Sequence, residues 1–350
     1  FTQVLTQGVP ADWTRLTLPG RHWKWRMRGA VPYWILEHQD VLSQPYDLIF
    51  ASSYVPLAEL IGLAPQLAEG PRLLYFHENQ LTYPAQAGQK RERDNHFGVT
   101  QLVSALAAQA LVFNSDFNRR SFFEAGEQLL ARLPDRVPKG WIPRLRARSR
   151  VLGVPLELPI LSPACFTTQR EGAPVILWNH RWEHDKAPEL FAQALLRLAD
   201  EGLGFDVALC GQRFGQVPPG FEALKTRLGP RVRTFGESGS RTEYEGWLRK
   251  ADIAVSTARH EFFGIAMLEA AHFGARPLVP DALAYPELFE PCYRYAVGGL
   301  EGALTALLKP DAEPPTLRAD RQYITRGLGA PLLQRYADLF EEMASAKVAT

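Results

Sequence analysis

Residues 252–270 read DIAVSTARHEFFGIAMLEA, and this stretch decides the fold. Its first six residues have the apolar, β-branched composition of a buried strand, and its last residues have the composition of a helix. The connecting loop ends in FFG, so we expect the helix to begin near Phe262 or Phe263. A strand that leads directly into a helix is the unit from which parallel α/β sheets are built.

The same alternation of short apolar runs with helical patterns continues in both directions from this stretch. The predicted strands lie at 15–18, 46–52, 72–78, 110–115, 150–157, 174–179, 206–211, 231–236, 252–257 and 276–280. Near-continuous apolar strands separated by helices indicate parallel sheets that are covered on both faces. Ten strands are too many for one comfortable sheet, and the proline-rich stretch VPLELPILSPA (154–164) is the natural boundary.

We therefore predict the α/β class, with two Rossmann-like domains facing a central cleft. The N-terminal domain is expected to span 1–158 and the C-terminal domain 159–330. Residues 331–350 are expected to form a final helix that packs on one of the two domains, the N-terminal one being our choice.

Composition narrows the function classes. The chain carries 39 basic and 38 acidic side chains and 3 cysteines, and no apolar run approaches the roughly 18 residues of a membrane span. Three scattered cysteines favour a reducing, cytoplasmic compartment without a disulfide framework. A GxGxxG stretch after the first strand, a GxxxxGK[ST] loop and a D-x-D pair are all missing. A nicotinamide enzyme, a P-loop enzyme and a metal-dependent diphosphate site are therefore disfavoured.

Two glutamates flank the helix start in HEFFGIAMLEA. Glu261 precedes it, and Glu269 lies eight residues further on, on nearly the same helical face. A helix that begins after a parallel strand presents free backbone N–H groups and a partial positive charge to an anion. Gly264 lets a ligand approach that backbone closely. The alternative is a helix with an ordinary N-terminal acid and a surface glutamate.

Two cations follow the first predicted strand of the second domain, in HRWEHDKAPEL (180–190). Arg181 and Lys186 lie in a loop at the carboxyl end of a parallel strand, which is where ligands bind in such sheets. Together with the helix start they could clamp a diphosphate, although a solvated loop is the simpler alternative. His180 and His184 could also suggest a metal pair, but no third ligand is evident in the sequence.

A basic patch stands in the first domain, where residues 21–28 read RHWKWRMR without an acid. We interpret it as extended chain, because its apolar and basic residues alternate. Lys24, Arg26 and Arg28 would then share one exposed face, which either contacts an RNA backbone or is simply solvated. The stretch KGWIPRLRARSR (139–150) adds a second basic segment, in which Pro143 argues against a helix.

The pattern R-x4-K after one strand and E-x7-E after another resembles the retaining GT-B glycosyltransferases of family 4, over roughly residues 150–300. That resemblance implies that Glu261 orients the donor sugar, Glu269 holds the nucleotide ribose, and Arg181 and Lys186 hold the diphosphate. It also implies that Gly211, residues 234–238 and the backbone of Phe263, Gly264 and Ile265 line the donor site. The donor would be bound without a metal or another cofactor.

Longer motifs resemble one branch, the tRNA-queuosine α-mannosyltransferase family. They are LPGRHWKWRMRG (18–29), YFHENQLTYP (75–84), RERDNHFG (91–98), VFNSDFN (112–118) and STARHEFFGIAMLEA (256–270). The resemblance implies transfer of mannose from GDP-mannose to queuosine in a tRNA anticodon, with retention of configuration. It makes His77 a catalytic histidine near the donor sugar. The residues expected on the acceptor side are Arg21, Lys24, Arg26, Arg28, Glu78, Asn79, Arg93, Asp94 and His96.

One departure from that branch concerns the N-terminus, where FTQVLTQGVPADWT (1–14) stands in place of a strand and a glycine-rich loop. Two other function classes stay open at this point: a glycosyltransferase for a lipid, small-molecule or polysaccharide acceptor, and a catalytically silent RNA-binding protein with a GT-B frame. The residues alone also leave open guanine or uracil in the donor, the cognate tRNA and the oligomeric state.

Overall fold

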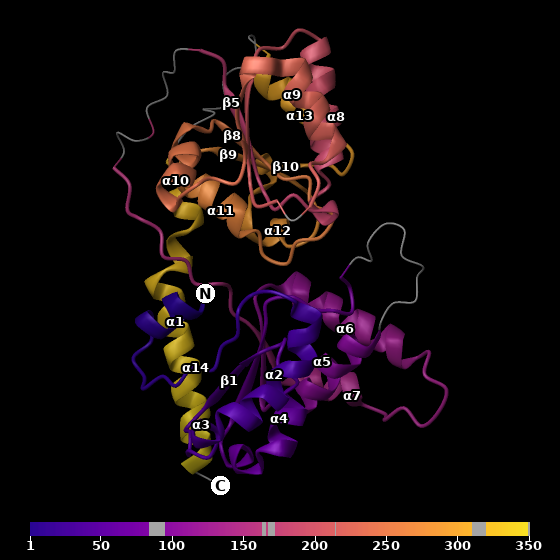
Figure 1. The fold of residues 1–350 in the computed structure, drawn as a ribbon, viewed down its shortest axis with the longest axis vertical. Helices are drawn as coiled ribbons and strands as arrows, with labels where there is room; N and C mark the ends of the chain where they lie inside the picture. The colour runs from indigo at the N-terminus through magenta and orange to yellow at the C-terminus, as the bar shows by residue number, and fades with distance from the viewer. Residues whose placement is uncertain (84–94, 163–165, 167–171, 214, 310–319, 349–350) are drawn as a thin grey trace. The chain divides into compact units, whose positions relative to one another are not determined.

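The computed structural model describes all of the chain except residues 84–94, 163–165, 167–171, 214, 310–319 and 349–350. Its contacts divide the chain into two compact units (Figure 1). Unit 1 comprises residues 1–156 and 330–350, and unit 2 comprises residues 157–329. The sequence-based boundary lay at 158, and the final helix is counted with unit 1.

Unit 1 is built around a parallel sheet of four strands in the order β1-β2-β3-β4. The strands are β1 (Ile49–Ser52), β2 (Arg72–Phe76), β3 (Ala110–Phe113) and β4 (Ser149–Val151). Every residue of β3 is buried, as expected for a strand that is covered on both faces. Phe76 and Phe113 stack at 4.4 Å between ring centres and form the middle of this core with Phe122.

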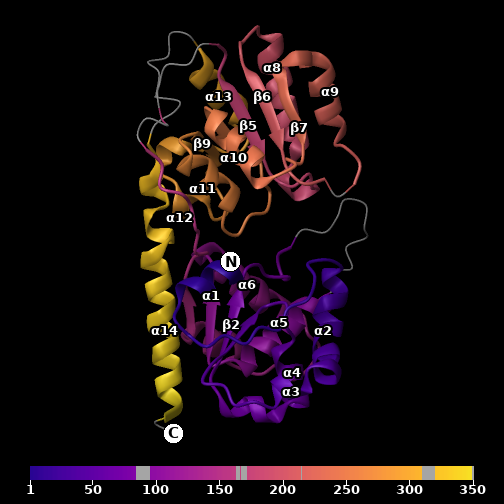
Figure 2. The same ribbon diagram turned by 60° about the vertical axis from the view of Figure 1, so that its left-hand side comes forward.

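The helices of unit 1 connect these strands and cover the sheet. They are α1 (Thr2–Gly8), α2 (Trp23–Glu37), α3 (Gln39–Leu42), α4 (Leu57–Leu63), α5 (Asn95–Ala107), α6 (Asp116–Leu130), α7 (Trp141–Ala147) and α14 (Ala330–Val348), with the 3-10 turn η1 (Pro65–Glu69). Ser115 caps α6 by accepting the N–H of Asn118 at 3.0 Å. In Figure 2, α14 runs along the side of unit 1. It is held there by the Tyr336 hydroxyl, which donates to the carbonyl of Gly153 at 2.9 Å.

Unit 2 contains a parallel six-stranded sheet in the order β10-β9-β8-β5-β6-β7. The strands are β5 (Val175–Asn179), β6 (Asp206–Cys210), β7 (Val232–Gly236), β8 (Ile253–Val255), β9 (Arg276–Pro280) and β10 (Arg294–Tyr295). The chain moves outward from β5 to β7 and then returns to the other side of β5 with β8. This reversal makes the carboxyl ends of β5 and β8 the topological switch point, where ligands bind in doubly wound sheets.

Helices of unit 2 follow its strands. They are α8 (Pro188–Asp200), α9 (Pro219–Leu228), α10 (Arg241–Lys250), α11 (Ile265–His272), α12 (Tyr285–Leu288) and α13 (Leu300–Leu308), with 3-10 turns η3 (His184–Lys186), η4 (Gly229–Arg231), η5 (Pro291–Tyr293), η6 (Gln322–Ile324) and η7 (Arg326–Leu328). Trp178, Phe191 and Phe221 are fully buried and join β5, α8 and α9 in one apolar core. Among the described residues, no helix is both long and apolar enough to cross a bilayer.

Three predictions of local structure were wrong. Residues 15–18 form no strand, and the short strand β10 was not anticipated. Residues 21–28 are not extended, because α2 begins at Trp23 and continues through Pro32 to Glu37. Pro143 does not prevent a helix, because it is the third residue of α7. The first N–H groups of a helix have no intrahelical partner, so a proline costs little there.

Candidate active site

Two loops of unit 2 meet at the switch point. The loop after β5 carries Arg181 and Lys186, and the loop after β8 carries Glu261. Gly264, at φ 95°, ends that second loop and precedes α11, which begins at Ile265 rather than at Phe262 or Phe263. The positive φ is readily adopted only by glycine, so the loop geometry depends on this residue.

Lys186 is the centre of a buried ionic network. Its Nζ donates to the carbonyl of His260 at 2.7 Å and lies 3.2 Å from a carboxylate oxygen of Glu261 and 3.2 Å from one of Asp185. These three acceptors match the three donors of an ammonium group. Burial by itself would lower the pKa of Lys186, but the two carboxylates outweigh burial and raise it. The side chain is therefore a fixed positive charge with its hydrogen bonds already made.

Glu261 is held from two sides in this network. Besides Lys186, it accepts the backbone N–H of Phe263 at 3.2 Å and that of Gly264 at 3.0 Å. Burial would raise the pKa of Glu261, but Lys186 outweighs burial and leaves it below the ordinary value. The carboxylate thus occupies part of the backbone N–H surface that the sequence assigned to a ligand.

Two histidines beside this network are neutral near pH 7. Burial and, to a smaller extent, the positive charge of Lys186 lower the pKa of His180 and that of His260 to about 4. His180 follows β5 directly, and its ring hydrogen-bonds to the backbone of Val255. His184 lies elsewhere in its loop as an exposed residue. Among the described residues, no three His, Cys, Asp or Glu side chains are grouped as a metal site requires.

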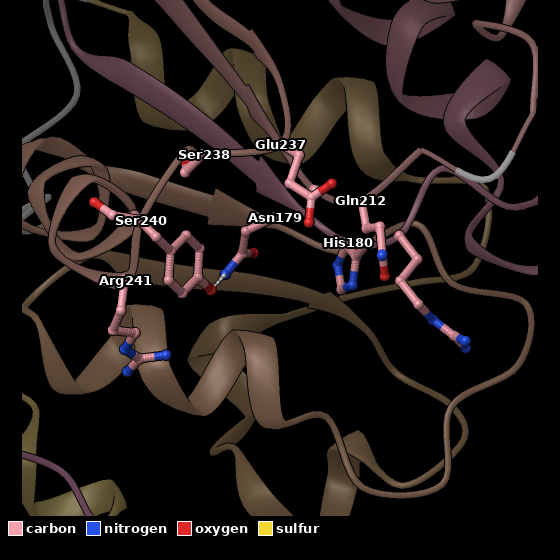
Figure 3. Close-up of a pocket in the computed structure, with 10 residues that line it drawn as sticks. Asn179, His180, Gln212, Glu237, Ser238, Ser240 and Arg241 are labelled. Atoms are coloured by element: carbon pink, nitrogen blue, oxygen red, sulfur yellow. Dashed lines mark hydrogen bonds between the residues drawn. The ribbon is translucent and has the colours of Figure 1, made fainter. Parts of the chain in front are cut away.

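A cavity of about 290 Å³ opens beside His180, at the carboxyl ends of β5, β6 and β7 (Figure 3). Its lining comprises Asn179, His180, Arg181, Gly211, Gln212, Glu237, Ser238, Ser240, Arg241 and Tyr244. Gly211 is required at this point, because a Cβ there would lie 1.8 Å from the carbonyl oxygen of His180. Arg181 is half-exposed, and its guanidinium lies 3.3 Å from the carboxylate of Glu183.

Glu269 reaches this cavity through two of its lining residues. Its carboxylate accepts from the guanidinium of Arg241 at 2.7 Å and from the Tyr244 hydroxyl at 3.1 Å. Asn179 donates to the same hydroxyl at 2.9 Å and to the carbonyl of Ala266 at 2.9 Å, which joins β5 to α10 and α11. Glu261 and Glu269 therefore belong to two adjacent environments, an ionic one with Lys186 and a polar one at the cavity.

Sequence reasoning missed six residues of the cavity lining and the ionic network: Asn179, Asp185, Gln212, Ser240, Arg241 and Tyr244. Asn179 and Asp185 could have been found, since one ends a buried strand and the other adjoins Lys186. Arg241 and Tyr244 come from a helix whose approach to Glu269 is a tertiary feature without a sequence signal.

His77 and Asn79 follow β2 in unit 1. Burial lowers the pKa of His77 to about 4, and its ring centre lies 4.6 Å from that of Tyr75. Asn79 is fully buried, with its amide nitrogen donating to Asn118 at 2.9 Å and to Ser121 at 3.1 Å. Its side chain thus holds the loop together, and its expected role on the acceptor side stays a prediction.

The other acceptor-side residues are distributed over three segments. Glu78 accepts from Tyr54 and from Gln80, and His96 is exposed in the first turn of α5. Arg93 and Asp94 lie outside the described residues. The basic residues Arg21, Lys24, Arg26 and Arg28 lie at or near the start of α2, where Arg26 is half-buried and the other three are exposed.

Comparison with known proteins gives two family matches. Residues 1–156 match the family model "tRNA-queuosine alpha-mannosyltransferase N-terminal", and residues 166–297 match "Glycosyl transferases group 1". The chain is 38% identical over 281 residues to the tRNA-queuosine alpha-mannosyltransferase of Drosophila melanogaster. That alignment covers 78% of this chain and 73% of the fly protein.

Solved structures show the same fold at low sequence identity. Sucrose-phosphate synthase from Thermosynechococcus elongatus superposes with a TM-score of 0.67 at 16% identity, covering 97% of this chain and 83% of that one. The Anabaena protein HepE in complex with UDP gives 0.63 at 16% identity, covering 90% of this chain and 82% of that one. The fold is therefore GT-B, as the sequence predicted.

Proposed function

The chain belongs to the tRNA-queuosine alpha-mannosyltransferase family of glycosyltransferases, and we propose that it transfers mannose from GDP-mannose to queuosine in a tRNA anticodon with retention of configuration. The observation that carries the donor half is the position of Lys186, buried between two carboxylates at the switch point of unit 2 and next to a polar cavity.

Arg181 and Lys186 are proposed to hold the diphosphate in different ways. Arg181 is half-exposed at the cavity, so its guanidinium is accessible to the phosphate oxygens of a ligand that binds there. Lys186 has its three hydrogen bonds already made, so a phosphate oxygen has to displace one acceptor. Exchange with Glu261 is the simplest route, because it also releases that carboxylate to bind hydroxyls of the donor sugar.

Glu269 is proposed to bind the ribose. Arg241 and Tyr244 fix its carboxylate at the cavity, where it can accept hydrogen bonds from two vicinal hydroxyls. Gly211 and residues 234–238 provide the surface for the base and ribose, as the family resemblance implies. The nucleotide and the sugar are then recognised by separate glutamates.

Chemistry proceeds by cleavage of the bond between the sugar C1 and the diphosphate oxygen and formation of a bond from C1 to a hydroxyl oxygen of the queuosine ring. Negative charge grows on the leaving phosphate, and the positive charges of Arg181 and Lys186 oppose it. The hydroxyl proton passes to a phosphate oxygen on the same face of the sugar. Attack and departure on one face retain the configuration at C1, and His77 is proposed to contact the transferred sugar.

Metal-independent transfer is part of the proposal, because two fixed cations supply the charge that a divalent ion supplies in D-x-D enzymes. A chelator should therefore leave the rate of transfer unchanged, and restoration of a lost rate by Mg²⁺ or Mn²⁺ would contradict this point. We further propose that the enzyme works in the cytoplasm, where its tRNA substrate is found.

The experiment incubates the protein with tRNA that contains queuosine and with the same tRNA that contains guanosine in its place. Each is supplied with GDP-mannose, UDP-glucose or GDP-glucose, and the digested nucleosides are weighed. We expect one hexose to be added only to queuosine and only from GDP-mannose. Cleavage of the product by an α-mannosidase but not by a β-mannosidase would report retention of configuration. Transfer to a lipid or a free sugar would contradict the proposed tRNA acceptor.

A further inference from the structure

Helix α2, labelled in Figure 2, has two distinct faces. Met27, Ala30, Val31 and Trp34 are buried at helical spacing and pack into the core of unit 1. The opposite face exposes Trp25 and Leu36, flanked by Arg28 and Tyr33, and Lys24 is exposed in the first turn. An exposed tryptophan one turn from an exposed cation is an unusual surface, since tryptophan is generally buried.

Trp25 packs against its own helix although 64% of its surface is exposed. Its indole lies directly against Gly29, one helical turn further on. A Cβ added to Gly29 would lie 2.7 Å from Cε2 of the indole and 2.8 Å from Cζ2. Glycine within a helix costs about 1 kcal/mol relative to alanine, so this residue is explained by the ring that it accommodates. One face of the indole rests on the helix and the other faces outward.

Positive charge dominates this part of the surface. No acidic residue occurs between positions 13 and 36 of the sequence, whereas Arg28 is exposed one turn after Trp25, and Lys24 is exposed with its Nζ 5.7 Å from the ring centre of Trp23. The guanidinium of Arg28 lies 5.1 Å from the ring centre of Phe97, which directs it along the surface towards α5. The matching ligand has planar apolar groups joined by negative charges, and unpaired RNA combines the two.

We propose that this face of α2 binds an unpaired segment of RNA, with one base stacked on Trp25 and the neighbouring phosphates bound by Lys24 and Arg28. The inference deepens the proposed function, on which it rests for the identity of the RNA, the anticodon loop of the acceptor tRNA. It also replaces the extended arrangement predicted from the sequence, because in the helix Arg26 is half-buried and leaves this face.

The test is filter binding of three RNAs: the queuosine tRNA, its isolated anticodon stem-loop and a fully paired RNA duplex. Trp25→Ala should bind the first two about 10-fold or more weakly, because stacking on an aromatic ring contributes about 1–3 kcal/mol per base. Trp25→Phe should recover most of that loss. The duplex offers no unpaired base, so we expect it to bind more weakly than the stem-loop. Its affinity should be the same for the parent and for Trp25→Ala.

Gly29→Ala separates binding from folding. Alanine favours the helix, so the midpoint of thermal unfolding should stay the same or rise. The added Cβ displaces the indole, so stem-loop binding should fall towards that of Trp25→Ala. Leu36→Ala is the matched control, because it also removes an exposed apolar side chain of α2 but should bind RNA like the parent. The double variant Lys24→Ala, Arg28→Ala should have a shallower plot of log affinity against log salt concentration, with the slope reduced by about 1 to 2.

Parent-like stem-loop binding by both Trp25→Ala and Gly29→Ala would overturn the inference. The inference would also be overturned if Trp25→Ala no longer bound anionic phosphatidylserine vesicles but still bound RNA like the parent. That result would assign the face to a membrane. The proposed function fails separately. If Trp25→Ala loses stem-loop binding while the parent transfers no sugar to queuosine, the RNA surface stands and the mannosyl transfer does not.

Discussion

The donor site of unit 2 and the exposed face of α2 in unit 1 use positive charge in opposite ways. Lys186 is buried, is bound to three acceptors and cannot leave its position without loss of stability. Lys24 and Arg28 are exposed on α2, the helix that also exposes the ring of Trp25. A buried charge suits a small ligand that must be held in one geometry, whereas an exposed patch suits a long polyanion that is bound by many weak contacts. The two regions should therefore respond differently to substitution, pH and salt.

The largest effect is expected for Lys186→Ala. Removal of the ammonium leaves the carboxylates of Asp185 and Glu261 buried together without a counter-charge, which costs about 3–5 kcal/mol in the free energy of unfolding. Transfer should also be lost. Urea unfolding measures the first effect. Arg181→Ala is the control: removal of this half-exposed cation should weaken GDP binding but lower the free energy of unfolding by less than about 1 kcal/mol. Equal stabilities of the two variants would contradict the buried network.

Acid should destabilise the protein. Burial holds the pKa of His77, His180 and His260 near 4, below the value of about 6.5 in an unfolded chain. Between pH 6.5 and 4 the unfolded state therefore binds more protons than the folded state, so stability is constant above this window and falls as the pH drops through it.

Thermal unfolding across this range provides the measurement. His260→Gln should flatten the slope relative to the parent. If the midpoint temperature of unfolding does not decrease as the pH is lowered from 6.5 to 4, these histidines are charged in the folded protein.

The two glutamates should separate nucleotide binding from sugar transfer. Glu269→Ala removes a fixed carboxylate from the cavity and should weaken GDP binding by about 1.5–3 kcal/mol. Glu261→Gln should bind GDP nearly normally but transfer slowly, because its proposed partner is the sugar. Calorimetry with GDP and single-turnover transfer distinguish the variants, and the roles are wrong if Glu261→Gln loses GDP binding while Glu269→Ala retains it.

These contrasts parallel what could be predicted from sequence. In unit 2, Lys186 and Glu261 lie side by side, as expected of loops that follow neighbouring parallel strands at one edge of a sheet, whereas the roles assigned to Arg181 and Glu269 stay predictions. The partners of Glu269 could not be predicted, since Arg241 and Tyr244 reach it only through the packing of α10 on α11.

In unit 1, local pattern was misleading. The seven residues of alternating character at 22–28 fit a strand, and Gly29 and Pro32 oppose a helix. Burial at Met27, Ala30, Val31 and Trp34 decides for the helix, and this periodicity is visible only over the longer window. The fold class was therefore predictable from strand–helix alternation, whereas the surface expected to meet RNA was assigned to the wrong conformation.

A smaller effect is expected at Tyr244, which bridges Asn179 and Glu269. Tyr244→Phe removes the hydroxyl but keeps the ring, so it should weaken GDP binding by only about 1 kcal/mol through a less well fixed Glu269. The same substitution in a Glu269→Ala background should have no further effect on GDP binding. Additive losses in this double-mutant cycle would show that Tyr244 contacts the nucleotide directly.

The most direct test of the division between the two regions is the steady-state kinetics of Arg181→Ala and Trp25→Ala with queuosine tRNA and GDP-mannose. We expect Arg181→Ala to raise the KM for GDP-mannose and leave the KM for tRNA near that of the parent. Trp25→Ala should do the reverse, raising the KM for tRNA alone by about 10-fold. The account is contradicted if both variants change the KM for the same substrate, or if neither changes a KM.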